Sequence, residues 1–131
     1  MKESFRLVEY FELSAEILYN SWLSSEKHSQ MTGGEAHSSS ELDGDFSAWD
    51  GYIHGRNKEL IPNSKIVQSW RTTEFEESDE DSMLTIQFER KGSGTELILE
   101  HENIPKGQTQ YLKGWIDHYF NPMHEYFQDL K

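Results

Sequence analysis

The six histidines of this 131-residue chain are the first side chains to consider for acid–base or metal chemistry. His118 and His124 are six positions apart, about 120° around a helix, whereas a zinc-binding pair on one helix face is four apart. The sequence has no HExxH motif, and its lack of cysteine excludes a thiolate zinc site and a cysteine nucleophile. We therefore expect no metal site and no cofactor, with the histidines solvated or hydrogen-bonded.

His101 differs from the other histidines because its position in a strand pattern points it inward. It shares parity with Leu97 and Leu99 in the segment 95–102. A buried ring nitrogen without a hydrogen-bond partner costs about 1–3 kcal/mol, so we expect Tyr119 or the backbone to be its partner. The same parity is compatible with His101 holding the polar end of a ligand, or acting as an acid or base.

Serine is abundant, but the sequence has no GxSxG motif for nucleophilic catalysis and no GxGxxG or P-loop for phosphates. Asp43 and Asp45 flank Gly44, where a turn favours short polar side chains in any case. We predict no catalytic residue, and an enzyme is kept only as an alternative.

Aromatic side chains are the strongest remaining signal, at 13% of the chain. The candidates are Trp49, Trp70, Phe88, Trp115, Tyr119 and Phe120. Such rings either fill a core or line an apolar pocket for a small hydrophobic molecule. The choice depends on the volume left between them, which a sequence does not give.

The segment 110–131 is predicted to be the helix that positions several of these rings. Its apolar residues form a centre line of Leu112, Tyr119, Met123 and Leu130, with Tyr111, Trp115 and Tyr126 on one flank and Ile116, Phe120 and Phe127 on the other. The apolar arc spans about 180°, which is broad for a surface helix. We expect a concave apolar surface from the preceding chain to hold this helix on two flanks.

The sequence patterns of the preceding residues predict that this surface is a β-sheet. Residues 5–13 indicate a first strand, and Ser14 is the expected N-cap of a short helix to Leu23, with room for a further turn to Met31. Residues 35–41 are interpreted as a short polar strand, and Asp-Gly turns at 43–44 and 50–51 separate the strands 45–49 and 52–60. Strands follow at 65–73, 83–90 and 95–102, and the six carboxylates within 74–81 indicate a solvated loop.

The order of elements predicts an α+β domain with its helices on one side of a curved antiparallel sheet of about six to seven strands. The length suits a single domain over residues 1–131. A net charge of −12 would repel phosphate backbones and anionic membranes, so we expect no nucleic-acid or membrane partner. The N-terminal residues show neither a signal peptide nor a membrane span, and the expected compartment is the cytoplasm.

Five short motifs carry a resemblance to a known family: residues 43–46 (DGDF), 49–53 (WDGYI), 66–71 (IVQSWR), 94–97 (GTEL) and 114–115 (GW). In order and spacing they resemble a stand-alone, bacterial-type relative of the C-terminal domain of the heat-shock protein 90 ATPase activators, in the START-like, or helix-grip, superfamily. The resemblance implies a curved sheet wrapped around the C-terminal helix, with a cavity between them. The eukaryotic activators carry an additional N-terminal domain that contributes to chaperone docking.

The resemblance and the aromatic set together imply a binding protein for an apolar or aromatic small molecule, as a monomer or weak homodimer. The expected ligand-binding residues are Trp49, Ile53, Trp70, Phe88, Leu99, His101, Trp115, Tyr119 and Met123. An alternative is a co-chaperone-like module that contacts heat-shock protein 90 or its clients. A second alternative is an enzyme of the aromatase, cyclase or hydrolase kind found elsewhere in the superfamily.

Overall fold

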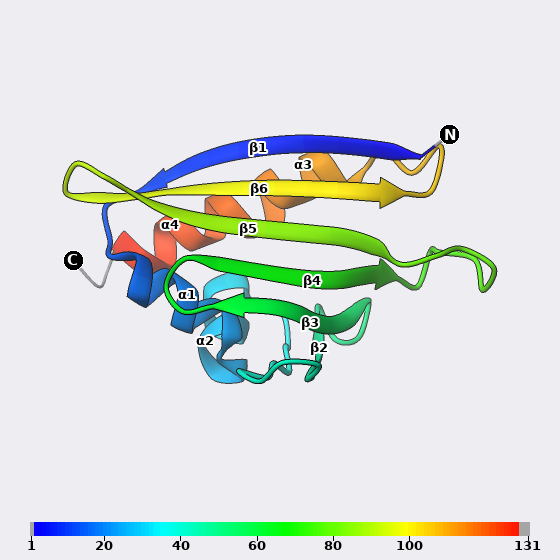
Figure 1. The fold of residues 1–131 in the computed structure, drawn as a ribbon, viewed down its shortest axis with the longest axis horizontal. Helices are drawn as coiled ribbons and strands as arrows, with labels where there is room; N and C mark the ends of the chain where they lie inside the picture. Colours follow the sequence, from blue (N-terminus) through cyan, green and yellow to red (C-terminus); the bar gives the residue numbers. More distant parts are fainter. Residues whose placement is uncertain (1, 129–131) are drawn as a thin grey trace.

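A six-stranded antiparallel sheet is the framework of the computed structural model, which describes residues 2–128 (Figure 1). Its strand order is β1-β6-β5-β4-β3-β2, so β2 to β6 form a meander and the N-terminal strand joins it beside β6. The strands are β1 (Glu3–Phe11), β2 (Asp45–Ala48), β3 (Ile53–Ile61), β4 (Lys65–Thr72), β5 (Ser82–Lys91) and β6 (Gly94–Ile104). The antiparallel α+β architecture predicted from the sequence is confirmed.

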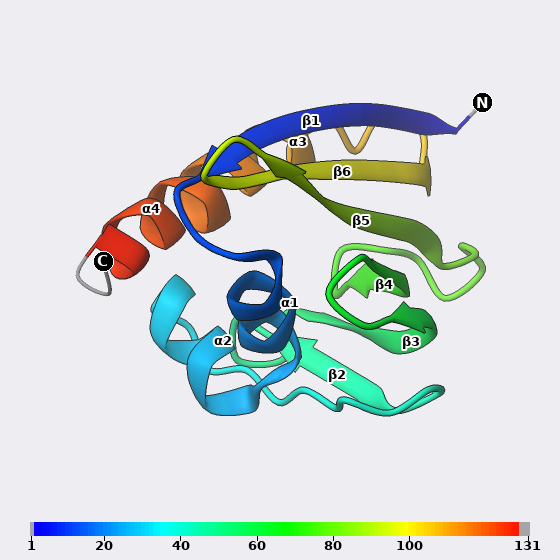
Figure 2. The same cartoon turned by 60° about the vertical axis from the view of Figure 1, so that its left-hand side comes forward.

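Two short helices follow β1 and lie in the concave side of the sheet together with the C-terminal helix (Figure 2). Helix α1 (Ala15–Leu23) begins as expected at Ser14, whose hydroxyl accepts the N–H of Ile17 at 3.3 Å. Helix α2 (Ser25–Thr32) has its own serine N-cap, Ser24, and ends at Gly33, whose φ of 89° is favourable only for glycine. No helix of the described residues is long and apolar enough to cross a membrane.

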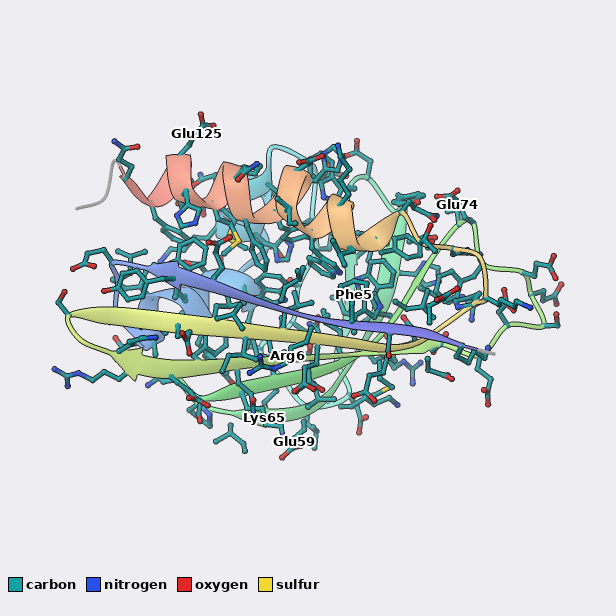
Figure 3. The ribbon with its side chains drawn as sticks, turned by 90° about the horizontal axis from the view of Figure 1, so that it is seen from above. Phe5, Arg6, Glu59, Lys65, Glu74 and Glu125 are labelled. Atoms are coloured by element: carbon teal, nitrogen blue, oxygen red, sulfur yellow. The ribbon has the colours of Figure 1, made fainter. Side chains whose placement is uncertain are left out.

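Strand alternation determines which side chains face the C-terminal helix. One alternating set of residues from β4, β5 and β6 is buried, and it includes the three predicted to share an inward face in β6, Leu97, Leu99 and His101; the others are Ile66, Gln68, Trp70, Leu84, Ile86 and Phe88. The opposite face carries charge, and Figure 3 shows Arg6, Glu59 and Lys65 on the side of the sheet away from the helix. Lys65 and Glu59 pair there at 3.2 Å. The helix therefore packs on the apolar face alone.

The C-terminal helix contains a π-helical turn. It consists of α3 (Tyr111–Trp115), the π segment η1 (Ile116–Phe120) and α4 (Asn121–Gln128). The N–H of Asn121 bonds to the carbonyl of Ile116, five residues back. Pro122 follows at once, and a proline has no N–H and its ring clashes with the carbonyl four residues earlier. The wide turn accommodates this proline without ending the helix.

The π turn changes which residues of the helix are buried. Tyr111, Trp115, Tyr119, Met123 and Phe127 recur every four positions and all are buried. In a regular helix four positions advance by about 40° beyond a full turn, so this set would drift off one face. The regular spacing instead placed Leu112 on the buried centre line, and that prediction is wrong: its exposed fraction is 40%. Leu130 lies outside the described residues.

The predicted polar strand at residues 35–41 does not form. The segment makes a single antiparallel bridge, between His37 and Ser47. Two of its other N–H groups bond to serine side chains of α2: that of Ala36 bonds to the Ser29 hydroxyl at 2.8 Å, and that of Ser38 bonds to the Ser25 hydroxyl at 2.7 Å. Serine hydroxyls compete with strand ladders for backbone partners, so the segment is fastened to α2 rather than paired along its length.

The acidic segment 74–81 is a loop between β4 and β5, as expected, and Arg71 organises it. The Arg71 guanidinium donates to the carbonyl oxygens of Asp79 and Glu76 at 3.1 and 2.9 Å and to the Asp81 carboxylate at 2.7 Å. Five of the six carboxylate side chains in the segment are exposed and Asp79 is half-buried. Because exposed ion pairs contribute little, this loop is shaped mainly by the backbone contacts of Arg71.

Gly55 in β3 gives a test of the sheet packing. A Cβ at this position would lie 1.8 Å from the Ser69 carbonyl oxygen and 2.8 Å from the Phe46 ring. We expect Gly55→Ala to lower the free energy of unfolding by about 1–3 kcal/mol, measured by urea denaturation. Gly114→Ala is the control, because its Cβ meets no atom within 4 Å and alanine favours a helix by about 1 kcal/mol. Equal stability of the two variants would contradict this packing.

Candidate ligand cavity

A cavity of about 250 Å³ lies between the C-terminal helix and one end of the sheet. Five of its lining residues come from the helix: Tyr111, Gly114, Trp115, His118 and Tyr119. The other four come from β3, β4 and the turn between β2 and β3: Trp49, Tyr52, Ile53 and Trp70. Almost all of the lining atoms are apolar. The cavity therefore offers ring faces and carbon atoms to anything inside it.

Trp49 and His118 are among the least buried lining residues and mark the outer end, or mouth, of the cavity. Their rings contact each other edge-on, with centroids 5.6 Å apart. Trp49 has a φ of 52°, a left-handed conformation that costs a bulky residue about 1–3 kcal/mol. The turn is held from outside, because the N–H of Asp50 bonds to the Glu35 carbonyl and the N–H of Glu35 bonds to the Asp50 carboxylate. Gly34 packs against the indole, and a Cβ there would lie 2.4 Å from it.

His101 stands behind the cavity wall, in a chain of hydrogen bonds that fixes its tautomer. The indole N–H of Trp115 donates to Nδ1 of His101 at 3.1 Å, so Nδ1 carries no proton. Nε2 therefore carries the proton and donates to the Ser82 hydroxyl at 2.8 Å, which in turn donates to the Trp70 carbonyl at 2.6 Å. Burial lowers the pKa of His101 to about 3, so the ring is neutral.

Tyr119 is anchored by a second buried histidine, His28. Nδ1–H of His28 donates to the Trp22 carbonyl at 2.8 Å, which leaves Nε2 to accept the Tyr119 hydroxyl at 2.9 Å. Burial lowers the pKa of His28 and raises the pKa of Tyr119, so both stay neutral. The expectation that His101 bonds to Tyr119 or to the backbone is wrong, because its partners are the side chains of Trp115 and Ser82. The Tyr119 hydroxyl bonds instead to His28, 91 positions away.

The remaining tyrosines of the wall also direct their hydroxyls away from the cavity. Tyr111 donates to Gln108 Oε1 at 2.7 Å and accepts from Thr72 at the same distance. Tyr52 donates to the Glu74 carboxylate. Burial is the main cause of the raised pKa of both tyrosines, and the Glu74 hydrogen bond adds to it for Tyr52. Each ring thus presents carbon to the cavity and oxygen to the protein.

Five of the nine residues predicted from the sequence to bind a ligand line this cavity: Trp49, Ile53, Trp70, Trp115 and Tyr119. The other four are buried elsewhere. Phe88 packs edge-on against Tyr19, Leu99 and Met123 belong to the main core, and His101 lies behind Trp115 and Trp70. The cavity adjoins the end of the sheet near the β2–β3 turn. Strand parity shows which face of a sheet is buried but not where along that face open volume lies.

Four lining residues were missed: Tyr52, Tyr111, Gly114 and His118. Tyr111 lies in the predicted apolar arc of the helix, and Gly114 belongs to the GW motif at residues 114–115. The sequence therefore contained a pattern that could have identified both. His118 was considered only as a metal ligand, together with His124. It lies in the π segment, and the structure places it against the cavity.

The polar groups near the cavity are not arranged for catalysis. Ser82 and His101 form a serine–histidine pair, but both have an exposed fraction of 0% and the serine proton goes to the Trp70 carbonyl rather than to the imidazole. A nucleophile needs its proton taken by the base and an open path to substrate. Among residues 2–128 no group of three or more metal-binding side chains converges. The arrangement is suited to holding an apolar molecule.

The low pKa of His101 predicts a loss of stability in mild acid. Below its ordinary pKa of 6.5 the unfolded chain takes up a proton at this residue, whereas the folded protein does so only near pH 3. Stability therefore falls as the pH falls, and His101 alone should contribute a loss of about 2 kcal/mol between pH 7 and pH 5. Urea unfolding of His101→Gln should show a pH dependence smaller by that amount. His54→Gln, at an exposed histidine of β3, is the control, and an equal pH dependence in H101Q and H54Q would contradict the assignment.

Sequence comparison gives relatives for nearly the whole chain. It is 30% identical over 122 residues to the human protein named activator of 90 kDa heat shock protein ATPase homolog 1, which covers 92% of this chain and 36% of the human one. A Dictyostelium discoideum activator is 31% identical over 115 residues, covering 86% of this chain and 30% of its own. The chain thus spans about a third of the length of these relatives.

Solved structures share the fold. An HSP90 activator from Plasmodium falciparum superposes with a TM-score of 0.83 at 27% identity, covering 97% of this chain and 95% of that one. CalU16 from Micromonospora echinospora gives a TM-score of 0.78 at 15% identity, covering 95% and 76%, which shows the helix-grip fold alone.

The profile of one family, described as Activator of Hsp90 ATPase homolog 1-like protein, matches residues 12–128. That match includes the β2–β3 turn, the inward face of β4 and the helix that carries the cavity wall. With the curated relatives and the shared fold, it shows that this chain belongs to the family of activator of Hsp90 ATPase homolog 1-like proteins.

Proposed function

We propose that this protein binds a small apolar or aromatic molecule in the cavity between sheet and C-terminal helix, without transforming it. The observation that carries the proposal is the cavity of about 250 Å³ with aromatic walls, most of whose polar atoms are hydrogen-bonded to protein partners. An apolar ligand would gain dispersion contacts with every wall and would leave no wall hydroxyl without its partner.

The volume sets the size of the ligand. An engineered apolar cavity of roughly 150 Å³ is large enough to hold benzene. Pockets for drug-sized ligands begin at about 300 Å³. A cavity of about 250 Å³ therefore suits a molecule of one or two rings.

A first test is native mass spectrometry of the purified protein, followed by denaturing extraction. A copurified apolar compound of one or two rings is the expected result, because ligand burial in an otherwise empty apolar cavity is favourable. If no compound copurifies and naphthalene, added as a probe, causes no chemical-shift change at the cavity tryptophans, the proposed function is wrong.

Gly114 offers a way to block the cavity without disturbing its walls. It lies in the helix at the rim, and the space that a Cβ would enter is empty to 4 Å. We expect Gly114→Leu to fill part of the mouth and weaken naphthalene binding by roughly tenfold or more, a loss of about 1.4 kcal/mol. Titration followed by tryptophan fluorescence measures this.

Gly114→Ala is the matched control for that substitution. The added methyl group is small compared with the cavity volume. The affinity of the Gly114→Ala variant for naphthalene should therefore stay close to that of the unmodified protein. Both variants replace a helical glycine and should be at least as stable as the parent. Unchanged naphthalene affinity in G114L would place the binding site elsewhere.

A co-chaperone-like role is the second candidate, favoured by the names of the relatives that match most of this chain. Those proteins are about three times as long, so their activity cannot be carried over whole. A pull-down with a heat-shock protein 90 from the same source, combined with an ATPase assay, tests this role. Absence of both binding and stimulation would exclude it, whatever the outcome of the ligand experiments.

A further inference from the structure

We propose that the ligand of this cavity is a neutral one- or two-ring molecule with a hydrogen-bond acceptor, such as a ketone or ring-nitrogen group, and that the indole N–H of Trp70 is the donor that binds it. This inference rests on the proposed ligand-binding function and goes beyond it by assigning the polar chemistry of the ligand.

Most polar atoms of the wall are already committed to protein partners. The Trp115 indole N–H bonds to His101, and the hydroxyls of Tyr119, Tyr111 and Tyr52 bond to His28, Gln108 and Glu74 respectively. A ligand that took one of these groups would leave its present partner unsatisfied at a cost of about 1–3 kcal/mol. None of the four is therefore a free donor.

Trp70 is the exception among the buried rings that line the cavity. The indole N–H of Trp70 has no hydrogen-bond partner within residues 2–128. In the same part of the chain, every side-chain nitrogen or oxygen that is fully buried does have such a partner, so the Trp70 nitrogen is not fully buried. That nitrogen is therefore in contact with open space, although the residue as a whole has an exposed fraction of only 3%. Because Trp70 lines the cavity, the cavity is the space that its N–H meets.

The orientation of this donor is fixed by its neighbours. Three rings contact the Trp70 indole with centroid distances of 4.5 Å (His101), 5.0 Å (Tyr111) and 5.8 Å (Trp115). The Trp70 backbone is held between Gly55 and Ser82 in the sheet. The indole cannot rotate to find a protein acceptor without displacing these rings, so the donor is preorganised for a ligand.

Trp49 is the other tryptophan of the cavity without an internal partner, but it stands at the mouth. Its side chain is half-buried, so water can reach it there without a ligand. A donor in contact with water gains little from a ligand acceptor, whereas a donor in a nearly apolar cavity gains a full hydrogen bond. Trp70 is therefore the position where an acceptor matters.

The same chemistry excludes charged ligands. An indole N–H only donates, and a single donor does not compensate the desolvation of a carboxylate in an apolar cavity. The chain's net charge of −12 adds repulsion of anions. A neutral acceptor on a ring system is the class that remains.

A pair of probes with the same two-ring skeleton tests the assignment: 1-indanone, which has a ketone acceptor, and indane, which has none. Their affinity ratio is measured for the unmodified protein and for Trp70→Phe, which keeps a ring but removes the donor. We expect the preference for 1-indanone over indane to fall roughly two- to tenfold in W70F, the value of one hydrogen bond. Comparing ratios cancels the different hydration of the two probes.

Trp49→Phe is the matched control, because it removes an indole N–H at the mouth, and its ratio should equal that of the unmodified protein. A second measurement needs no variant: the indole ¹H–¹⁵N signal of Trp70 should shift downfield with 1-indanone and not with indane. An unchanged ratio in W70F, or an equal response of the Trp70 signal to both probes, overturns this inference while leaving ligand binding intact. If neither probe binds the unmodified protein, the proposed function is overturned and this inference with it.

Discussion

The burial of one aromatic face of the C-terminal helix in the concave side of the sheet is the constraint on which the rest of this structure depends. Tyr111, Trp115, Tyr119, Met123 and Phe127 supply that face. A fully buried side chain of this size contributes about 1.5–3 kcal/mol relative to an exposed one. Such a set stays on one side of the helix only because of the π turn before Pro122. The geometry of the helix and the curvature of the sheet together therefore determine how the two surfaces pack.

Polar atoms on those rings restrict the fit further. Tyr119 and Trp115 each end in a donor that must find an acceptor inside the protein, and His28 and His101 provide it. Both histidines therefore have to remain neutral, and burial lowers their pKa values accordingly. The hydrogen bonds hold the rings at their outer edges, so the rings cannot relax into the space between them. We regard this anchoring as the reason that a cavity persists in an otherwise closely packed core.

Strain at the cavity mouth fits the same view. Trp49 keeps a left-handed backbone because its turn is bonded to Glu35 and packed on Gly34. Local strain of this kind persists where the surroundings over-determine it, and it is concentrated at binding sites. The second candidate function, the proposed co-chaperone-like role, would depend on an external surface that contacts a large partner, and not on the cavity. The two candidate functions therefore make demands on different parts of the molecule.

The sequence by itself determined the order of the strands and helices that form, the inward parity of β6, the Ser14 cap and the family. These features depend on neighbours a few residues apart, where periodicity and turn chemistry act. Tertiary structure decided the rest. Serine side chains of α2 took the backbone groups of residues 35–41 that a strand would have used. His28, in a polar segment, became a core residue because the Tyr119 hydroxyl needed an acceptor. Which aromatic rings line open volume, and which are packed solid, depends on side-chain volumes and contacts summed over distant segments, and no local pattern encodes that sum.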